Sequence, residues 1–314
     1  MNNAPEISLT QLRDEVSYEL KHNCNDKINA NDRLVILMYG PPGSGKTTNA
    51  NLLVNALNEQ HPIASSSNST SDSESISQTL NRHGIIPTQK ISGLGGEETQ
   101  ICIYKDNIPD KVKHELSPAP YAVHLKMDGF HLPLSILPED MVKFRGCHDS
   151  FDAELVVRLS KLLLECDSTN NDWDLLSIPD FSHEIKDPTN PGTFIWKDTK
   201  VVVLEGLYLM LDVAPWDEIP HLVESIKKVN STKRIESRDT HVQVRVVRIH
   251  GGDEGEMSAR VAARHLHSGL VGSYQEGLDK YLANDKINAH VVETKSIRNQ
   301  DDWVVNTSSV NGQS

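Results

Sequence analysis

One short stretch holds the most chemically specific residues of the chain. Residues 39–48 read YGPPGSGKTT, directly after the apolar run RLVILM at 33–38. The spacing matches G-x-x-x-x-G-K-[ST], with Lys46 and Thr47 in the last two places. In such a loop the backbone N–H groups turn inward, and the positive end of the following helix adds to their field. The pattern predicts a cradle for the phosphates of ATP, in which Lys46 reaches the outer phosphates and the Thr47 hydroxyl holds Mg²⁺. The residues predicted to bind ATP are Gly40, Pro41, Pro42, Gly43, Ser44, Gly45, Lys46, Thr47 and Thr48.

Two acidic residues follow apolar segments further along the chain. Asp128 comes after AVHLKM at 122–127, and Glu205 comes after VVVL at 201–204. Parallel sheets bind ligands outside the carboxyl ends of their strands, so both carboxylates are expected near the cradle. Asp128 would take the proton of an attacking hydroxyl or hold the metal through water, with a turn Asp before Gly129 as the alternative. Glu205 would lie on the metal side, since a buried acid needs a partner, with a surface turn as the alternative.

Basic residues and histidines supply further candidates. Arg260 and Arg264 lie four residues apart in RVAARHLHSGL, so they share one face of a predicted helix. From that face they would neutralise charge on the phosphates, although a solvated basic surface is the better interpretation of the spacing alone. His131 and His183 follow predicted strand ends or loops, where a structural hydrogen-bonding role is the alternative.

The elements that must position these residues alternate between strand and helix. Strands are expected at 33–38, 122–128, 200–206, 241–249 and 287–293. An amphipathic helix is expected near the N-terminus, another directly after the glycine loop, and a third after Asp152 as N-cap. This alternation predicts an α/β fold, with a doubly wound, mostly parallel sheet, helices on both faces and a lid helix.

We expect a single domain over residues 1–305. Residues 61–119 are interpreted as an insertion that is partly disordered, since ASSSNSTSDSESIS at 64–77 is too polar to bury a core. The glycines of ISGLGGEETQ at 91–100 come without a phosphate-loop lysine and indicate a plain loop. A disordered tail is expected at 306–314.

Composition limits the classes of partner. The formal net charge of −13 disfavours a general nucleic-acid binder, which needs a basic face. No apolar run is long enough to span a bilayer, and the first residues lack the features of a secretory signal. The four cysteines are far apart in the sequence, which favours free thiols. An intracellular, cytoplasmic protein is expected, and the sequence does not indicate its oligomeric state.

The order of the motifs resembles the phosphoribulokinase, uridine kinase and bacterial pantothenate kinase group of P-loop kinases. The blocks that carry the resemblance are GPPGSGKTT, MDGFHLP, RGCHDSFD, VVVLEGLYLMLD and IPDFSHEIKDP, and together they cover roughly 33–60 and 120–295. RVAARHLHSGL and EGLDKYLAND look most like the fungal branch, ATP-dependent kinases connected with endoplasmic reticulum membrane assembly. RGCHDSFD and HGGDEGE at 250–256 depart from the usual pattern of the group.

The resemblance implies a P-loop nucleoside triphosphate hydrolase fold and a reaction. That reaction is transfer of the γ-phosphate of ATP, with Mg²⁺, to an alcohol hydroxyl of a small metabolite, which the resemblance does not name. The implied roles are catalytic for Asp128 and Lys46, metal-binding for Thr47 and Glu205, substrate-binding for His131, Arg145 and His183, and lid residues for Arg260 and Arg264.

Two rival functions use the same cradle. An ATPase that acts as an assembly factor or nucleotide-driven switch would hydrolyse ATP without a metabolite acceptor. Such a protein would not need the carboxylate of MDGFH to recognise a protein partner. A GTPase switch is disfavoured, because no N-K-x-D guanine signature follows any predicted strand.

Overall fold

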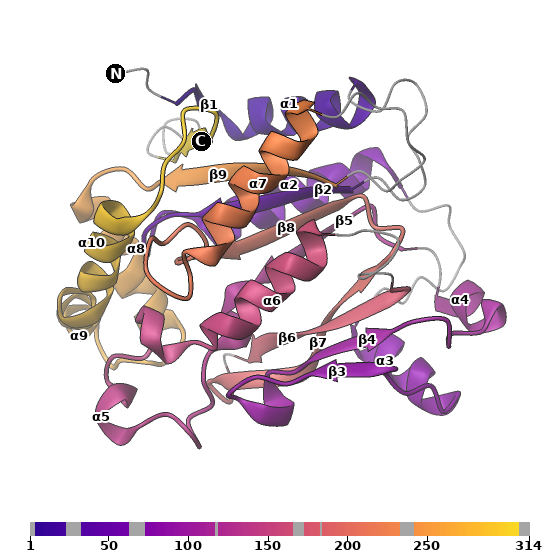
Figure 1. Cartoon of the computed structure of the whole chain (residues 1–314). Coiled ribbons are helices and arrows are strands. Elements are labelled where there is room, and N and C mark those ends of the chain that lie inside the picture. The colour runs from indigo at the N-terminus through magenta and orange to yellow at the C-terminus, as the bar shows by residue number, and fades with distance from the viewer. Residues whose placement is uncertain are drawn as a thin grey trace.

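A parallel central sheet forms the middle of the molecule (Figure 1). The computed structural model describes residues 4–22, 33–62, 73–116, 119–165, 173–182, 184–232 and 242–307. Within these ranges the central sheet has the order β1-β10-β9-β2-β8-β5, and each neighbouring pair is parallel. Its strands are β1 (Glu6–Ile7), β2 (Arg33–Tyr39), β5 (Ala122–Lys126), β8 (Val201–Gly206), β9 (Val242–His250) and β10 (Trp303–Asn306). The α/β fold predicted from the sequence is confirmed.

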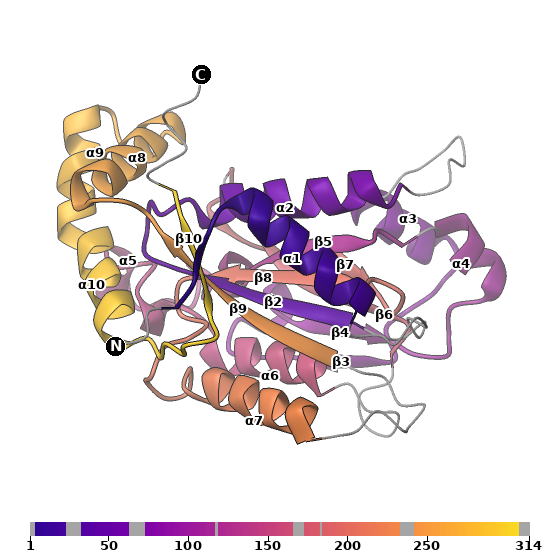
Figure 2. The same ribbon diagram turned by 90° about the horizontal axis from the view of Figure 1, so that it is seen from above.

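Helices cover both faces of this sheet, which explains why its central strands are apolar throughout. Every residue of β2 and β8 is buried. Figure 2 shows α1 (Leu9–His22) and α2 (Lys46–Gln60) on one side of the sheet, and α6 (Ala153–Leu164) and α7 (Glu218–Thr232) on the other. A separate hydrophobic cluster fills each side. As predicted, Asp152 caps α6, and its side chain accepts from the backbone N–H of Leu155 at 3.2 Å.

A second, antiparallel sheet lies beside the first and has the order β3-β4-β6-β7. Its strands are β3 (Gln89–Ile91), β4 (Ile101–Tyr104), β6 (Leu175–Ser182) and β7 (Asp187–Trp196). Helices α3 (Ser73–Arg82) and α4 (Asp110–Leu116) pack on it over a third hydrophobic cluster. Most of the predicted insertion at 61–119 is therefore folded, with a short 3₁₀ turn η1 (Gly96–Glu98) in the glycine loop, whereas 63–72 and 117–118 lie outside the described residues.

The proline-rich segment before β8 forms the β6–β7 hairpin, which the sequence reading missed. Pro179 lies at an irregularity in the pairing between Ile178 and Asp180, and such bulges tolerate proline. Shorter elements connect this region to the central sheet, namely η2 (Met127–Phe130), α5 (Glu139–Val142) and η3 (His148–Ser150).

A helical lid follows the carboxyl end of β9 (Figure 1). It contains α8 (Glu254–His267), α9 (Tyr274–Lys280), the π-helical turn η4 (Tyr281–Asp285) and α10 (Lys286–Lys295). The strand predicted at 287–293 is wrong, because these residues belong to α10. The buried residues Asn284, Asn288 and Val292 recur every four positions, which is a helical period. Two of the three are asparagines, so the spacing of apolar residues in the sequence does not reveal this buried helical face.

The C-terminal part of the described chain also corrects a prediction. Asn306 belongs to β10, and the Thr307 hydroxyl donates to the backbone carbonyls of Ser44 at 3.0 Å and His250 at 3.1 Å. These two residues are therefore not part of a disordered tail, and 308–314 lie outside the described residues.

Two further findings concern membranes and cysteines. Within the described ranges, no helix is both long and apolar enough to cross a membrane.

Cys102 and Cys147 are free thiols, as predicted, and Cys24 and Cys166 lie outside the residues that the structure describes.

Candidate active site

The glycine loop lies between β2 and α2, at the carboxyl edge of the central sheet. Gly43 and Gly45 have φ values of +77° and +90°, in the left-handed region that favours glycine. A Cβ on Gly43 would lie 2.5 Å from the backbone oxygen of Met257 in α8. The loop is therefore wrapped tightly between strand, helix and lid, as a phosphate cradle requires.

Lys46 lies at the N-terminus of α2 and is buried. Its ammonium group donates to the Pro41 carbonyl at 3.1 Å. Burial lowers the pKa of Lys46. The negative charges of Glu205 and Asp128 oppose this shift, and the positive charge of Arg264 adds to it. The structure therefore brings together four of the charged residues that the sequence predicted for the site.

Glu205 lies in β8 beside β2 and β5, where its register partners are Met38 and Lys126. The Thr47 hydroxyl donates to the Glu205 carboxylate at 3.1 Å. Burial alone would raise the pKa of Glu205, but the neighbouring His124, Lys46 and Thr47 together lower it. The carboxylate is thus kept ionised inside the protein.

His124 is a site residue that sequence reasoning missed. It lies on β5, and its Nε2 is 3.7 Å from a carboxylate oxygen of Glu205, beyond hydrogen-bond distance. Its Nδ1 is 2.8 Å from the Asn51 side-chain oxygen, within hydrogen-bond distance. Only the pairing of β5 with β8 brings His124 to Glu205.

Thr47 and Glu205 fit Mg²⁺. A hydroxyl and an ionised carboxylate are the oxygen ligands that this ion prefers. Among the described residues, no three His, Cys, Asp or Glu side chains form a metal-binding group. Mg²⁺ usually keeps several waters and binds through one or two protein oxygens and the substrate phosphates. When bound, the ion would supply positive charge beside the phosphates.

Asp128 follows β5 by two residues, within the 3₁₀ turn η2, so it does not close the strand itself. Its carboxylate is half-buried and has no hydrogen-bond partner among the described residues. The turn η2 packs closely against β6, because a Cβ on Gly129 would lie only 2.2 Å from the backbone oxygen of Pro179. This tight contact explains why Gly follows Asp128.

Gly129→Ala tests whether this contact positions Asp128. The added methyl has to displace the backbone of Pro179 or of η2, so we expect about 1–3 kcal/mol of destabilisation and a loss of activity. Thermal unfolding and phosphate transfer by the purified variant measure the two effects. Gly272→Ala is the matched control, since its new methyl would meet only the Glu276 carboxylate at 3.5 Å. Equal stability and activity of the two variants would contradict the role of the contact.

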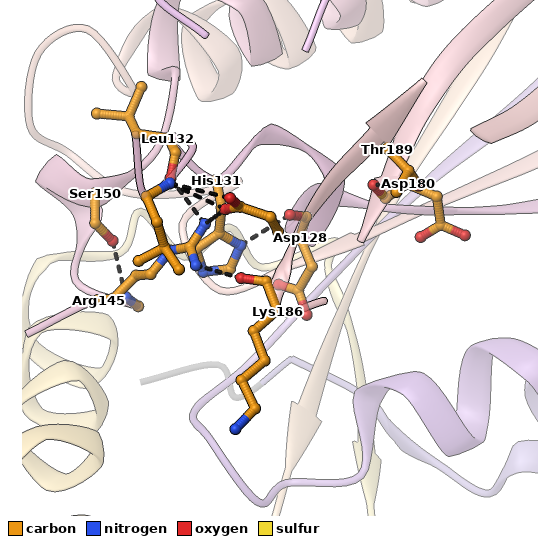
Figure 3. Close-up of polar contacts among 11 residues, drawn as sticks. Asp128, His131, Leu132, Arg145, Ser150, Asp180, Lys186 and Thr189 are labelled. Atoms are coloured by element: carbon orange, nitrogen blue, oxygen red, sulfur yellow. Dashed lines mark hydrogen bonds and ion pairs between the residues drawn. The ribbon is translucent and has the colours of Figure 1, made fainter. Parts of the chain in front are cut away.

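The segment after Asp128 forms a loop beside β6 and β7 (Figure 3). His131 Nδ1 is 2.8 Å from the Asp128 carbonyl, and the ring packs on Phe151 at 3.9 Å and Phe181 at 5.0 Å. Burial lowers the pKa of His131, which the Asp128 charge opposes. His131 therefore borders the predicted acceptor side as a largely neutral ring.

Arg145 holds this loop in place. Its guanidinium donates to the carbonyls of Leu132 at 2.8 Å and Lys186 at 2.5 Å, and pairs with the Asp187 carboxylate at 2.5 Å (Figure 3). Asp187 also accepts from the Leu134 N–H at 3.0 Å. The charge of Arg145 is thus already neutralised, and its predicted role in substrate binding stays a prediction. His183 lies outside the described residues.

The two lid arginines differ in their contacts. Arg260 donates through Nε to the Gly43 carbonyl at 2.7 Å, and its guanidinium also donates to the Gly251 carbonyl, so it joins α8 to the phosphate loop. Arg264 is exposed and has no hydrogen bond or ion pair with another described residue, yet its charge reaches Lys46. Of the two predicted lid arginines, Arg264 alone has no such contact among the described residues, and its role toward the phosphates stays a prediction.

Asp285 is a second residue that sequence reasoning missed. It ends the turn η4, and its side chain is 13% exposed. Its charge acts on Lys46 and on the buried hydroxyl of Tyr208, which donates to the Gly146 carbonyl at 2.7 Å. Its place in EGLDKYLAND gives no sign of chemistry, because only the folding of the lid brings it to the site.

Comparisons with known proteins agree with this geometry. No protein-family model matches the chain. The chain is 26% identical to the ATP-dependent kinase YFH7 of Vanderwaltozyma polyspora, over 87% of this chain and 94% of that protein. It is 28% identical to the ATP-dependent kinase YFH7 of Kluyveromyces lactis, over 89% of this chain and 93% of that protein.

Two solved structures share the fold. The crystal structure of YFH7 from Saccharomyces cerevisiae, described as a P-loop containing kinase with a circular permutation, has a TM-score of 0.63 at 24% identity, and covers 96% of this chain and 99% of that one. A protein from Silicibacter sp. TM1040, assigned as a fructose transport system kinase, has a TM-score of 0.58 at 19% identity, and covers 95% and 98%. The resemblance to P-loop kinases that the motifs indicate is confirmed.

Proposed function

We propose that the chain is an ATP-dependent kinase that transfers the γ-phosphate of ATP to a hydroxyl group of a small molecule. One observation carries the proposal, namely that the unpartnered carboxylate of Asp128 lies within electrostatic reach of Lys46 at the phosphate loop. An acceptor hydroxyl between the two would face both a proton acceptor and the phosphate to be transferred.

Each residue then has a physical task. The loop N–H groups and Lys46 bind the phosphates, and Thr47 and Glu205 hold Mg²⁺. Asp128 orients the acceptor hydroxyl and accepts its proton as the new O–P bond forms and the bond to ADP breaks. Arg264 approaches the transferred group from the lid and neutralises its charge. Catalysis is therefore mostly positioning and charge neutralisation.

The names of the relatives support a kinase more than the rival ATPase. YFH7 is named an ATP-dependent kinase, and the Silicibacter protein is assigned as a fructose transport system kinase. An ATPase without a metabolite acceptor would use the same loop, but it gives no reason for a free carboxylate at Asp128. The connection with endoplasmic reticulum membrane assembly and the cytoplasmic location stay predictions from the sequence.

An untargeted metabolite screen tests the proposal. The purified protein is incubated with a cell extract and ATP labelled at the γ-phosphate, and products are separated by mass spectrometry. We expect the label to move to a small molecule that carries a hydroxyl group. ATP consumption that is the same with and without every metabolite fraction would instead favour the ATPase. Lys46→Ala serves as the inactive control.

A further inference from the structure

The lid motif EGLDKYLAND has no task in the proposed reaction, yet it places a carboxylate against the phosphate site. Residues 281–285 of this motif form the π-helical turn η4 between α9 and α10. Single π turns within helices are rare and occur frequently at functional sites. The turn ends at Asp285, whose side chain is 13% exposed.

Nothing in the described structure neutralises Asp285 through a direct contact. Its Oδ2 is buried and has no hydrogen-bond partner among the described residues. His265 Nε2 approaches to 3.7 Å, which is beyond hydrogen-bond distance. Burial, followed by the charges of Arg264 and Lys280, lowers the pKa of His265 to about 4, so the ring is neutral at neutral pH and the contact is not an ion pair.

Cations surround this carboxylate at longer range. Burial raises the pKa of Asp285, and the positive charges of Arg264, Lys280 and Lys46 oppose that shift. In return, the negative charge of Asp285 favours the protonated form of Lys46. Arg264 and Lys46 are the residues that would meet the outer phosphates, and both lie within reach of Asp285 before any phosphate is bound.

The turn is anchored on both sides, so the carboxylate is held rather than mobile. Asn284 donates to the Arg145 carbonyl at 3.1 Å, which joins η4 to the loop after Asp128. Tyr281 is fully buried, and a Cβ on Gly277 would lie 2.7 Å from the Ala262 carbonyl, so α9 packs directly on α8. Asp285 therefore keeps its place relative to the lid and the acceptor loop.

We propose that Asp285 is a positioning residue of the phosphate site, whose carboxylate balances the positive charge of Lys46 and Arg264 until the triphosphate replaces it. Glu205 and Asp128 also favour the charged form of Lys46, and Asp285 adds a third negative charge from the lid, where Arg264 also lies. This inference rests on the proposed function only in assuming that the loop binds ATP. A merely structural role of Asp285 would not predict that removing its charge increases the affinity for ATP, as this proposal does.

Binding measurements on Asp285→Asn test the proposal. The triphosphate no longer meets a repelling carboxylate, so we expect the Kd for ATP at pH 8 to fall on the order of threefold to tenfold, less at high salt. Adenosine carries no phosphate, and its Kd should stay unchanged. Asp285→Glu restores the charge and should return the Kd for ATP toward the wild-type value.

Asp279→Asn is the matched control, because it removes the same charge from an exposed position of α9. It should leave the Kd for ATP unchanged. A Kd for ATP that is unchanged or higher in Asp285→Asn, with the variant folded by thermal unfolding, would overturn the inference. Wild-type protein that binds ATP but phosphorylates no acceptor would overturn the proposed function alone, since the binding test remains valid.

Discussion

Asp128→Asn is expected to lower the rate of phosphate transfer by about 10²–10⁴-fold while leaving the Kd for ATP close to the wild-type value. The amide has the same size as the carboxylate, so the turn η2 and its contact with Pro179 should stay intact. What is lost is the group that accepts the acceptor proton and orients the hydroxyl. Transfer to the acceptor found by the metabolite screen and ATP titration measure the two quantities separately.

A control removes a carboxylate elsewhere in the same region. Asp140 is exposed in the first turn of α5, and Asp140→Asn should transfer phosphate at the wild-type rate. Turnover of Asp128→Asn at the wild-type rate would show that Asp128 is not the base. A large loss of ATP affinity in Asp128→Asn would show that its effect comes from a disturbed phosphate loop instead.

The phosphate side of the site could be predicted because its signals are local. The strand β2, the glycine loop and helix α2 are consecutive in the chain, and each leaves its own pattern in the sequence. β2 and β8 are buried on both faces, so they read as uninterrupted apolar runs that end at the site. The positions of Lys46, Thr47 and Glu205 follow from these elements.

The acceptor side and the lid could not be predicted in the same way, because their contacts are long-range. The hairpin β6–β7 contains prolines, which argue against a strand unless a bulge accommodates them. The buried face that runs from η4 into α10 carries Asn284 and Asn288, so the helical period is hidden among polar residues. His124 and Asp285 join the site only through strand pairing and lid packing.

The structure also shows contacts of the three predicted arginines that the sequence does not indicate. Arg145 was expected to bind substrate, yet its guanidinium is shared between Asp187 and two backbone carbonyls. Arg260 and Arg264 were expected to act together, yet Arg260 is bound to the Gly43 carbonyl and only Arg264 is free of hydrogen bonds within the described residues. The types and spacing of these residues in the sequence do not distinguish such roles.

Lys46→Ala is expected to abolish measurable phosphate transfer and to raise the Kd for ATP by about 10²–10³-fold. The ammonium group is the one buried cation of the described phosphate loop, and the substitution leaves the outer phosphates without it. The variant should therefore lose the rise in Tm that ATP gives the wild-type protein. That rise reflects a stabilisation free energy of RT ln(1 + [ATP]/Kd). Thermal unfolding with and without ATP measures this loss directly.

Stability without ATP separates this effect from simple misfolding. Because burial lowers the pKa of Lys46, the charged lysine costs free energy in the unliganded protein. Lys46→Met keeps most of the side-chain volume and removes the charge, so its Tm without ATP should equal or exceed that of the wild type. A Lys46→Met variant that is less stable without ATP, or that still gains stability from ATP, would contradict the assignment of Lys46 as the buried phosphate ligand.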